Sequence, residues 1–175
     1  TPRDPFEMTA EEAQHVGAAF APGTTWLGLY GEPRLIYTDA AFRPGPHRGS
    51  DRRTVHLGVD VFMPAGTAVY APLDGVVEVV EYRDRDLDYG GMVILAHTTP
   101  AGDRFSALYG HLSRESVARL APGQRVARGI AFAALGAPEE NGGWAPHLHL
   151  QLALITDGLG QDWPGVADPD DADLW

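Results

Sequence analysis

The chain alternates between short apolar runs, rich in valine, and turns that contain glycine and proline. Segments such as Pro64-Ala65-Gly66 and Pro72-Leu73-Asp74-Gly75 have the residues of tight turns. The runs around them lie at residues 55–62, 68–71, 75–82, 92–97, 105–112, 124–126, 130–135 and 148–155. Many short strands at regular spacing are typical of a sandwich or a barrel. The pattern therefore predicts a mainly β fold with an antiparallel, barrel-like core and short helices.

The same pattern divides the chain into three segments. Residues 1–53 predict an N-terminal arm with a helix at 9–20, a hairpin at 25–37 and a basic loop, and we expect this arm to pack on the core. Residues 54–157 hold the strands of the core, and residues 158–175 form an acidic C-terminal tail. The chain is long enough for one substantial core, so we expect one domain.

Composition narrows the classes of function. A net charge of −11 disfavours nucleic acid as a partner, because phosphate binding needs clustered lysine and arginine. The absence of cysteine excludes disulfides, thiolate metal sites and cysteine nucleophiles. No apolar run approaches the roughly 20 residues of a membrane span. The chain begins at Thr1 rather than methionine, so we expect it to be a piece of a larger multidomain chain.

His56 and Asp60 are four residues apart in the run His56-Leu57-Gly58-Val59-Asp60. Residues four apart in an extended strand face the same side, so an imidazole and a carboxylate would project together. Gly58 lies between them on that face and leaves space for a metal or a substrate to approach. Imidazole and carboxylate suit Zn²⁺, at about 2.0–2.2 Å each. Taken alone, the motif also fits a surface histidine and a turn-bonding aspartate.

A second motif, Pro146-His147-Leu148-His149, lies between a glycine-rich turn and an apolar run. In an extended strand its two imidazoles face the same side, about 7 Å apart. Together with His56 and Asp60 they offer one ligand more than an open catalytic zinc site needs, which is three. One histidine of the pair can complete the site, and the other would then face the water.

His111 lies near the end of the run at 105–112. Hydrolysis needs a group that takes a proton from water and passes it to the leaving amine. The chain has no HExxH glutamate, so histidines would have to do this work. His111 and His147 could flank the water as that pair. Taken alone, His111 is equally well explained as an edge histidine bonded to a backbone carbonyl.

The motifs HLGVD, FMPAGTAVYAPLDGVV, YGHLS and PHLHLQ follow one another between residues 54 and 154. In this order they resemble the lysostaphin/LytM-type zinc endopeptidases, and the resemblance covers most of the chain. It implies an antiparallel β-sheet core, a duplicated hybrid motif, with a narrow groove over the metal. It also implies a zinc-dependent metalloendopeptidase whose usual substrates are cross-bridges or stem peptides of peptidoglycan.

The resemblance also assigns roles to the candidate residues. It implies one Zn²⁺ per chain, bound by His56, Asp60 and His149. It implies that His111 and His147 activate the water and stabilise the tetrahedral intermediate. The two histidines of the pair would therefore be unequal, with one holding the metal and the other acting on the water.

One loop departs from the family pattern. Residues 138–145, Pro-Glu-Glu-Asn-Gly-Gly-Trp-Ala, replace the Ser/Thr/Gly-rich loop that lines the groove in typical members. This loop, with RRTVHLGVD and DWPGVADP, looks more like a subgroup fused between a phosphotransferase-like domain and a class III aminotransferase. That subgroup implies a cytoplasmic protein with a substrate other than cell wall. Outside it, we expect an extracytoplasmic protein.

Five residues are candidates for contact with a peptide or peptidoglycan-like substrate. Asn141 and Trp144 belong to the loop that differs from the family. Arg52 and Arg53 adjoin His56 and could bind a carboxylate or a carbonyl. Tyr109 shares a strand face with His111, two residues away, and could donate to an oxyanion.

Two other functions compete with the peptidase. The first is a non-catalytic zinc-binding or regulatory module of the same fold within a larger aminotransferase-containing protein. The second is a histidine phosphocarrier-like or lipoyl-like domain, suggested by the stretch AGTAVYAPLDGVV. A phosphocarrier needs no aspartate ligand, so Asp60 speaks against it, and no lysine at a turn supports lipoylation.

Overall fold

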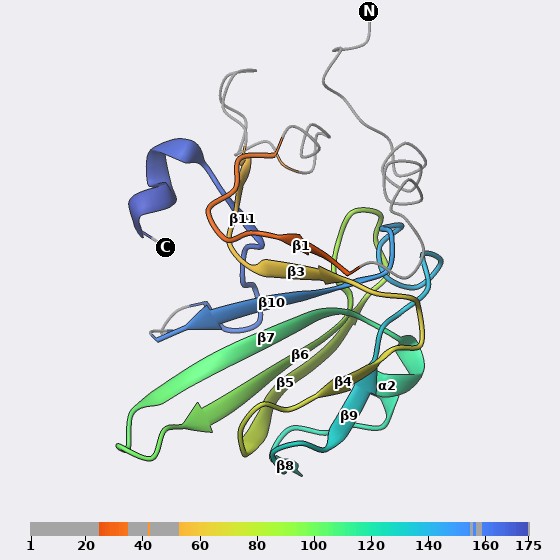
Figure 1. The fold of residues 1–175 in the computed structure, drawn as a ribbon, viewed down its shortest axis with the longest axis vertical. Coiled ribbons are helices and arrows are strands. Elements are labelled where there is room, and N and C mark those ends of the chain that lie inside the picture. Colours follow the sequence, from red (N-terminus) through yellow and green to blue (C-terminus); the bar gives the residue numbers. More distant parts are fainter. Residues whose placement is uncertain (1–24, 35–41, 43–52, 155, 157–158, 175) are drawn as a thin grey trace, which may run out of the picture.

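The computed structural model describes residues 25–34, 42, 53–154, 156 and 159–174 (Figure 1). Strands dominate this part of the chain, with a short α-helix and a terminal 3-10 helix. In chain order the elements are β1 (Trp26–Gly28), β2 (Val55–His56), β3 (Val59–Phe62), β4 (Ala68–Tyr70), β5 (Gly75–Arg83), β6 (Gly90–Thr98), β7 (Arg104–Leu112), α2 (Arg114–Ala118), β8 (Arg125–Val126), β9 (Ala131–Ala134), β10 (His147–Ala153), β11 (Val166–Ala167) and η2 (Pro169–Leu174).

Among the described residues, seven strands form one sheet in the order β1-β3-β10-β7-β6-β5-β8. Every neighbouring pair in it is antiparallel. Two small sheets, β4-β9 and β11-β2, lie outside it, and Figure 1 shows β10 running between β3 and β7. The prediction of a mainly β, antiparallel fold is confirmed. The helix expected at 9–20 and the second half of the hairpin, 35–37, lie outside the described residues.

The large sheet carries a separate apolar cluster on each face, because side chains alternate along a strand. On β7, Ala107 and Tyr109 face one cluster and Leu108 faces the other. The first cluster contains Val69, Ala71, Val77, Val93, Leu95, Ala107, Tyr109, Leu112, Val117, Val126 and Leu135. The second contains Tyr89, Met92, Ile94, Leu108 and Trp163. Each large apolar side chain buried here contributes about 1.5–3 kcal/mol, so both clusters support the strands that carry the histidines.

A register shift changes this alternation near the end of β7. β6 and β7 pair Val93 with Tyr109 but Gly91 with Leu112, so β7 holds one residue more than β6 in this stretch. An extra residue of this kind bends a strand and re-aims a side chain. Tyr109 and Leu112, three residues apart, therefore both reach the first cluster, and His111 turns toward the opposite face.

Residues 159–174 belong to the folded body, although their composition predicted only an acidic tail. β11 pairs with β2 and sets Val166 opposite His56, and Trp163 is buried in the second cluster. The division of the chain into arm, core and tail stays a prediction. Within the described ranges, every helix falls short of the length and apolarity needed to cross a membrane.

Candidate metal centre

Three adjacent strands bring the candidate residues together. β10 lies between β3 and β7, and His149 is in register with Asp60 on one side and Gly110 on the other. His147, two residues earlier on β10, faces the same side of the strand. His56 comes from β2, a short strand separate from β3. The sequence predicted His56 and Asp60 in one extended strand; the structure brings them together from two.

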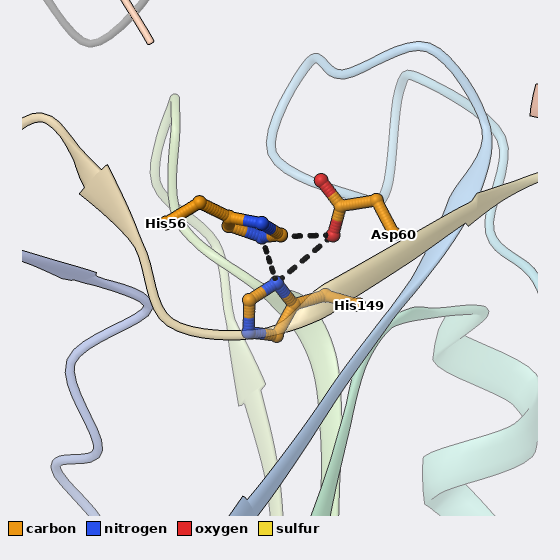
Figure 2. Close-up of side chains that lie close together, drawn as sticks. All are labelled: His56, Asp60 and His149. Carbon is orange, nitrogen blue, oxygen red and sulfur yellow. Dashed lines mark hydrogen bonds and ion pairs between the residues drawn. The ribbon is translucent and has the colours of Figure 1, made fainter. Parts of the chain in front are cut away.

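His56, Asp60 and His149 form a closed triangle of ligand atoms (Figure 2). The Nε2 atom of His56 lies 3.0 Å from Nδ1 of His149 and 3.1 Å from Oδ1 of Asp60. The third side, from Nδ1 of His149 to Oδ1 of Asp60, is also 3.0 Å. All three residues are at most 3% exposed, so water cannot screen these groups from one another.

The outer ring atoms of both histidines are anchored, and this determines which nitrogen faces the triangle. Nδ1 of His56 lies 3.0 Å from the carbonyl oxygen of Leu29, which can only accept a hydrogen bond. Nε2 of His149 lies 3.3 Å from Oε1 of Gln151, also an acceptor. Each outer nitrogen therefore carries the proton, and each inner nitrogen presents a lone pair. Two lone pairs and a carboxylate oxygen that converge at 3 Å fit a bound cation.

Asp60 is ionised in this setting. Burial alone would raise the pKa of its carboxyl, but its electrostatic interaction with His147 and the polar contacts of Oδ1 with His149 and His56 outweigh burial and hold the pKa well below its usual range. Two imidazoles and one carboxylate are the donors that zinc prefers in open catalytic sites. The donor set therefore fits one zinc ion.

His111 and His147 form a second pair beside this triangle, with ring centroids 4.2 Å apart. Nδ1 of His111 donates to the carbonyl oxygen of Asn141 at 2.9 Å, and Nδ1 of His147 donates to that of Ala145 at 2.7 Å. Both residues therefore present an unprotonated Nε2, and the Nε2 atom of His147 lies 3.8 Å from Oδ1 of Asp60. These are the atoms that can accept a proton.

Burial keeps both members of this pair neutral. It lowers the pKa of His111 well below its usual value, and the electrostatic interactions with His147 and His149 lower it further. Burial also lowers the pKa of His147, against the opposing attraction of Asp60. Neutral imidazoles are proton acceptors, so both groups suit general-base chemistry near neutral pH.

His111 reaches the site through a strained backbone. Its φ is +62°, a left-handed conformation that non-glycine residues adopt at a cost of order 1–3 kcal/mol. The conformation coincides with the register shift of β7, and the backbone N–H of His111 donates to the carbonyl oxygen of Tyr89 at 2.9 Å. In this conformation the imidazole of His111 does not follow the regular alternation of side chains along β7 and lies beside His147.

Gly58 has a different role from the one expected. A Cβ at Gly58 would lie 2.5 Å from Cε1 and 2.7 Å from Nε2 of His149. The space beside this glycine is therefore filled by the imidazole ring of His149 and is not open for a substrate. Gly58 is required because His149 packs directly against its backbone.

Tyr109 does not reach the site, and the prediction of an oxyanion donor there was wrong. Tyr109 is in register with Leu150 on β10, so it faces away from His149 and packs in the first apolar cluster. Its ring lies 5.0 Å from that of Phe132. The expectation assumed regular alternation from Tyr109 to His111, and the extra residue in β7 breaks that alternation.

Asn141 lies at the site but uses its side chain internally. It is fully buried, and its amide bonds Trp144 through both donor and acceptor: Nδ2 donates to the carbonyl oxygen of Trp144 at 3.0 Å, and Oδ1 accepts from its N–H at 3.0 Å. Its own carbonyl oxygen holds His111. Asn141 therefore shapes the loop and orients His111, and its side chain is not available to a substrate.

Trp144 stays a candidate for substrate contact. Its ring centroid lies 6.2 Å from that of His111 and 6.5 Å from that of His147. Arg53 donates its backbone N–H to the carbonyl oxygen of Phe42 at 3.0 Å, and the Phe42 ring lies 6.4 Å from Trp144. A substrate role for Arg53 stays a prediction. Arg52 lies outside the described residues.

Three residues of the site were not predicted from the sequence. Gln151 anchors His149 and lies two residues beyond it, so strand alternation could have found it. Tyr89 lies under the site, with its ring 5.8 Å from that of His111 and 5.5 Å from that of His149. Arg34 contacts Asp60 from a segment 26 residues earlier. No local pattern marks the last two.

The model of peptidase family M23 matches residues 54–160, which is more than half of the chain. The chain belongs to peptidase family M23. The matched region includes the triangle of His56, Asp60 and His149, and it also includes the pair of His111 and His147. The members are zinc metallopeptidases, and the donor set of His56, Asp60 and His149 fits one such ion.

Curated relatives agree with this assignment. An uncharacterized metalloprotease of Haemophilus influenzae is 36% identical over 145 residues, covering 82% of this chain and 27% of the relative. The peptidoglycan DD-endopeptidase ShyA of Vibrio cholerae is 36% identical over 109 residues, covering 62% of this chain and 22% of ShyA. The chain thus spans about a quarter of the length of these relatives.

A solved structure supports the fold. The solution structure of lysostaphin aligns with 90% of this chain and 51% of its own length, at 22% identity and a TM-score of 0.51. The expected lysostaphin-type fold is confirmed. The expected fusion to phosphotransferase-like and aminotransferase domains stays a prediction.

Proposed function

We propose that the chain is a zinc-dependent metalloendopeptidase that hydrolyses peptide bonds of peptidoglycan or a closely related peptide. One observation carries the proposal: in a member of family M23, three ligand atoms converge beside two neutral histidines that present Nε2. A metal-only structural site would need no such pair. A non-catalytic zinc module leaves the pair without a purpose, and a phosphocarrier, which could use paired histidines, needs no aspartate ligand such as Asp60.

His56, Asp60 and His149 would hold the zinc. Bound zinc would polarise the scissile carbonyl and make a water molecule acidic enough to react near neutral pH. The remaining chemistry belongs to the chain itself. Nε2 of His111 or of His147 accepts the proton released by the attacking water and returns it to the nitrogen of the leaving amine.

The backbone anchors make this transfer efficient. The carbonyl oxygens of Asn141 and Ala145 hold the Nδ1 protons of the two histidines, so each ring is fixed in one tautomer. A fixed acceptor loses no free energy to reorientation during the reaction. General-acid or general-base groups placed in this way contribute about 10²–10⁴-fold to the rate.

The substrate proposal draws on the relative ShyA, which is named a peptidoglycan endopeptidase. Acting on peptidoglycan would require an extracytoplasmic location, and we propose that location together with the substrate. Trp144, beside both histidines, is the proposed contact for the substrate chain. Its large apolar ring would bind the peptide backbone near the scissile bond.

The proposal is tested on zinc-loaded protein with purified peptidoglycan and with a glycine-rich peptide. We expect one zinc per chain by elemental analysis and new amino groups released from at least one substrate. The protein without zinc is the control and should release none. Zinc bound without cleavage of either substrate would overturn the peptidase and favour the non-catalytic module. Transfer of phosphate from a phosphohistidine donor would favour the phosphocarrier.

A further inference from the structure

The two carboxylate oxygens of Asp60 have different partners. Oδ1 faces the inner nitrogens of His56 and His149, whereas Oδ2 accepts a hydrogen bond from Nη1 of Arg34 at 2.5 Å. We propose that Arg34 is a positioning residue that reserves Oδ2 and leaves Oδ1 as the single oxygen of Asp60 available to the metal. The inference rests on the proposed function only in that zinc binds at this triangle.

Arg34 lies outside residues 54–160, the region that matches the family model, and the fold brings it next to Asp60. β1 pairs with β3, and Gly28 is in register with Asp60. After the turn that follows β1, Pro33 forms a bridge with Val55, and the N–H of Arg34 donates to the carbonyl oxygen of Thr54 at 2.8 Å. These contacts fix the backbone of Arg34 beside the strand that carries the metal ligand.

Two neighbours hold the guanidinium in line. Nε of Arg34 donates to Oε2 of Glu32 at 3.1 Å, and the same Oε2 accepts from the N–H of Leu29. Gly28 provides the space: a Cβ at this position would collide with Nη2 of Arg34 and lie 3.2 Å from Cβ of Asp60. The guanidinium therefore passes over a glycine to reach the carboxylate.

Burial makes this contact strong. The side chain of Asp60 is 2% exposed and that of Arg34 is 15% exposed, so little water competes for Oδ2. Charge-assisted hydrogen bonds from arginine to a carboxylate are about twice as strong as neutral ones. A carboxylate whose second oxygen is held in this way can offer only the other one as a ligand.

The consequence for catalysis follows from ligand number. Catalytic zinc sites use three protein ligand atoms and keep a further position open. An aspartate that binds through both oxygens would take up that position. By holding Oδ2, Arg34 would keep the protein ligands at one atom from each of His56, Asp60 and His149.

The test compares zinc affinity and cobalt spectra of three variants with the parent protein. Arg34→Gln removes the charge, Arg34→Lys keeps the charge but loses the planar fork, and Gly28→Ala displaces the guanidinium while keeping every charge. Arg119→Gln is the matched control, because it removes one arginine from an exposed helical pair with Glu115. Zinc affinity is measured by competition with a chromophoric chelator.

We expect Arg34→Gln and Gly28→Ala to weaken zinc binding by about 10–100-fold, with Arg34→Lys between them and the parent. We expect the Co²⁺-substituted variants to lose the intense visible bands of a four-coordinate ion, because Asp60 gains a second contact. Arg119→Gln should match the parent in both. Should Arg34→Gln fail to fold by circular dichroism, Gly28→Ala carries the test, since the closest contact of its new Cβ is the movable end of the Arg34 side chain.

The two proposals fail separately. Parent-like zinc affinity and cobalt spectra in folded Arg34→Gln or Gly28→Ala would overturn the role of Arg34 and leave the peptidase intact. A parent protein that binds zinc but cleaves neither substrate would overturn the peptidase, whereas the expected losses in the variants would still support Arg34. A parent protein that binds no zinc would overturn both.

Discussion

Two ends of the same sheet each bury a histidine against a glycine. At one end, the ring of His149 packs on Gly58, and at the other the ring of His97 packs on Gly75, where a Cβ would lie 2.8 Å from Cε1. Both rings have one nitrogen anchored, since Nδ1 of His97 donates to the carbonyl oxygen of Asp74 at 2.9 Å. By burial and anchoring alone the two histidines cannot be told apart.

The second nitrogen separates them. Nδ1 of His149 meets His56 and Asp60 at 3.0 Å, whereas Nε2 of His97 has no hydrogen-bond partner among the described residues and its ring stacks on Phe105 at 5.1 Å. A buried imidazole becomes a candidate ligand when a carboxylate and further lone pairs converge on it. His97 has no such neighbours, and its role is to fill the core.

The largest effect should come from removing the two histidines themselves. We expect His149→Ala to lose both zinc and activity, because two ligands cannot hold a catalytic ion. His97→Ala should keep both and lose about 2–4 kcal/mol of folding stability to the cavity it leaves. Elemental analysis, substrate turnover and urea unfolding measure these outcomes. If folded His97→Ala bound no zinc, the distinction between His149 as a metal ligand and His97 as a core residue would be wrong.

A smaller effect should separate the two histidines of β10. His147→Ala should keep its zinc and lose activity by about 10²–10⁴-fold, because a proton acceptor is removed and the ligands stay. Zinc content and the rate of amine release are measured on the same sample. A metal-free His147→Ala would show that the roles within the pair are reversed.

Metal removal should destabilise the folded protein, but only in variants whose zinc site is intact. With zinc at about a thousand times its dissociation constant, the folded state should gain about 4 kcal/mol, so dialysis against a chelator should lower the melting temperature. The same shift is expected in His97→Ala, whereas His149→Ala should melt at one temperature with and without zinc. An equal response to chelator in all three proteins would place the stabilising metal elsewhere.

The smallest effects should come from substituting the two glycines that pack against these histidines, Gly58 and Gly75. Gly58→Ala should push the ring of His149 away and weaken zinc binding by about 10–100-fold. Gly75→Ala should leave zinc affinity unchanged and cost about 1–3 kcal/mol of stability through overpacking against His97. Chelator competition and urea unfolding separate the outcomes. Equal zinc affinities would mean that packing against Gly58 does not position His149.

The sequence predicted most of the site because its signals are local. Strand alternation placed His147 and His149 on one face, and the structure agrees. The same rule failed for Tyr109, because β7 carries one residue more than β6 before His111. Bulges arise from pairing with a neighbouring strand, so the strand's own pattern does not reveal them. The side chain of Asn141 is bonded to the backbone of Trp144, and spacing along the chain does not reveal a loop that closes on itself in this way.

The β class, the candidate donor residues and the resemblance to the family could be predicted without a structure, since residue types, their spacing and the order of motifs along the chain carry them. Only the folded chain shows which nitrogen of each histidine faces the triangle formed by His56, Asp60 and His149. Folding also turned His111 toward His147 and brought Arg34 onto Asp60. Each of these depends on hydrogen bonds between segments far apart in the chain, and such contacts exist only after the strands have paired.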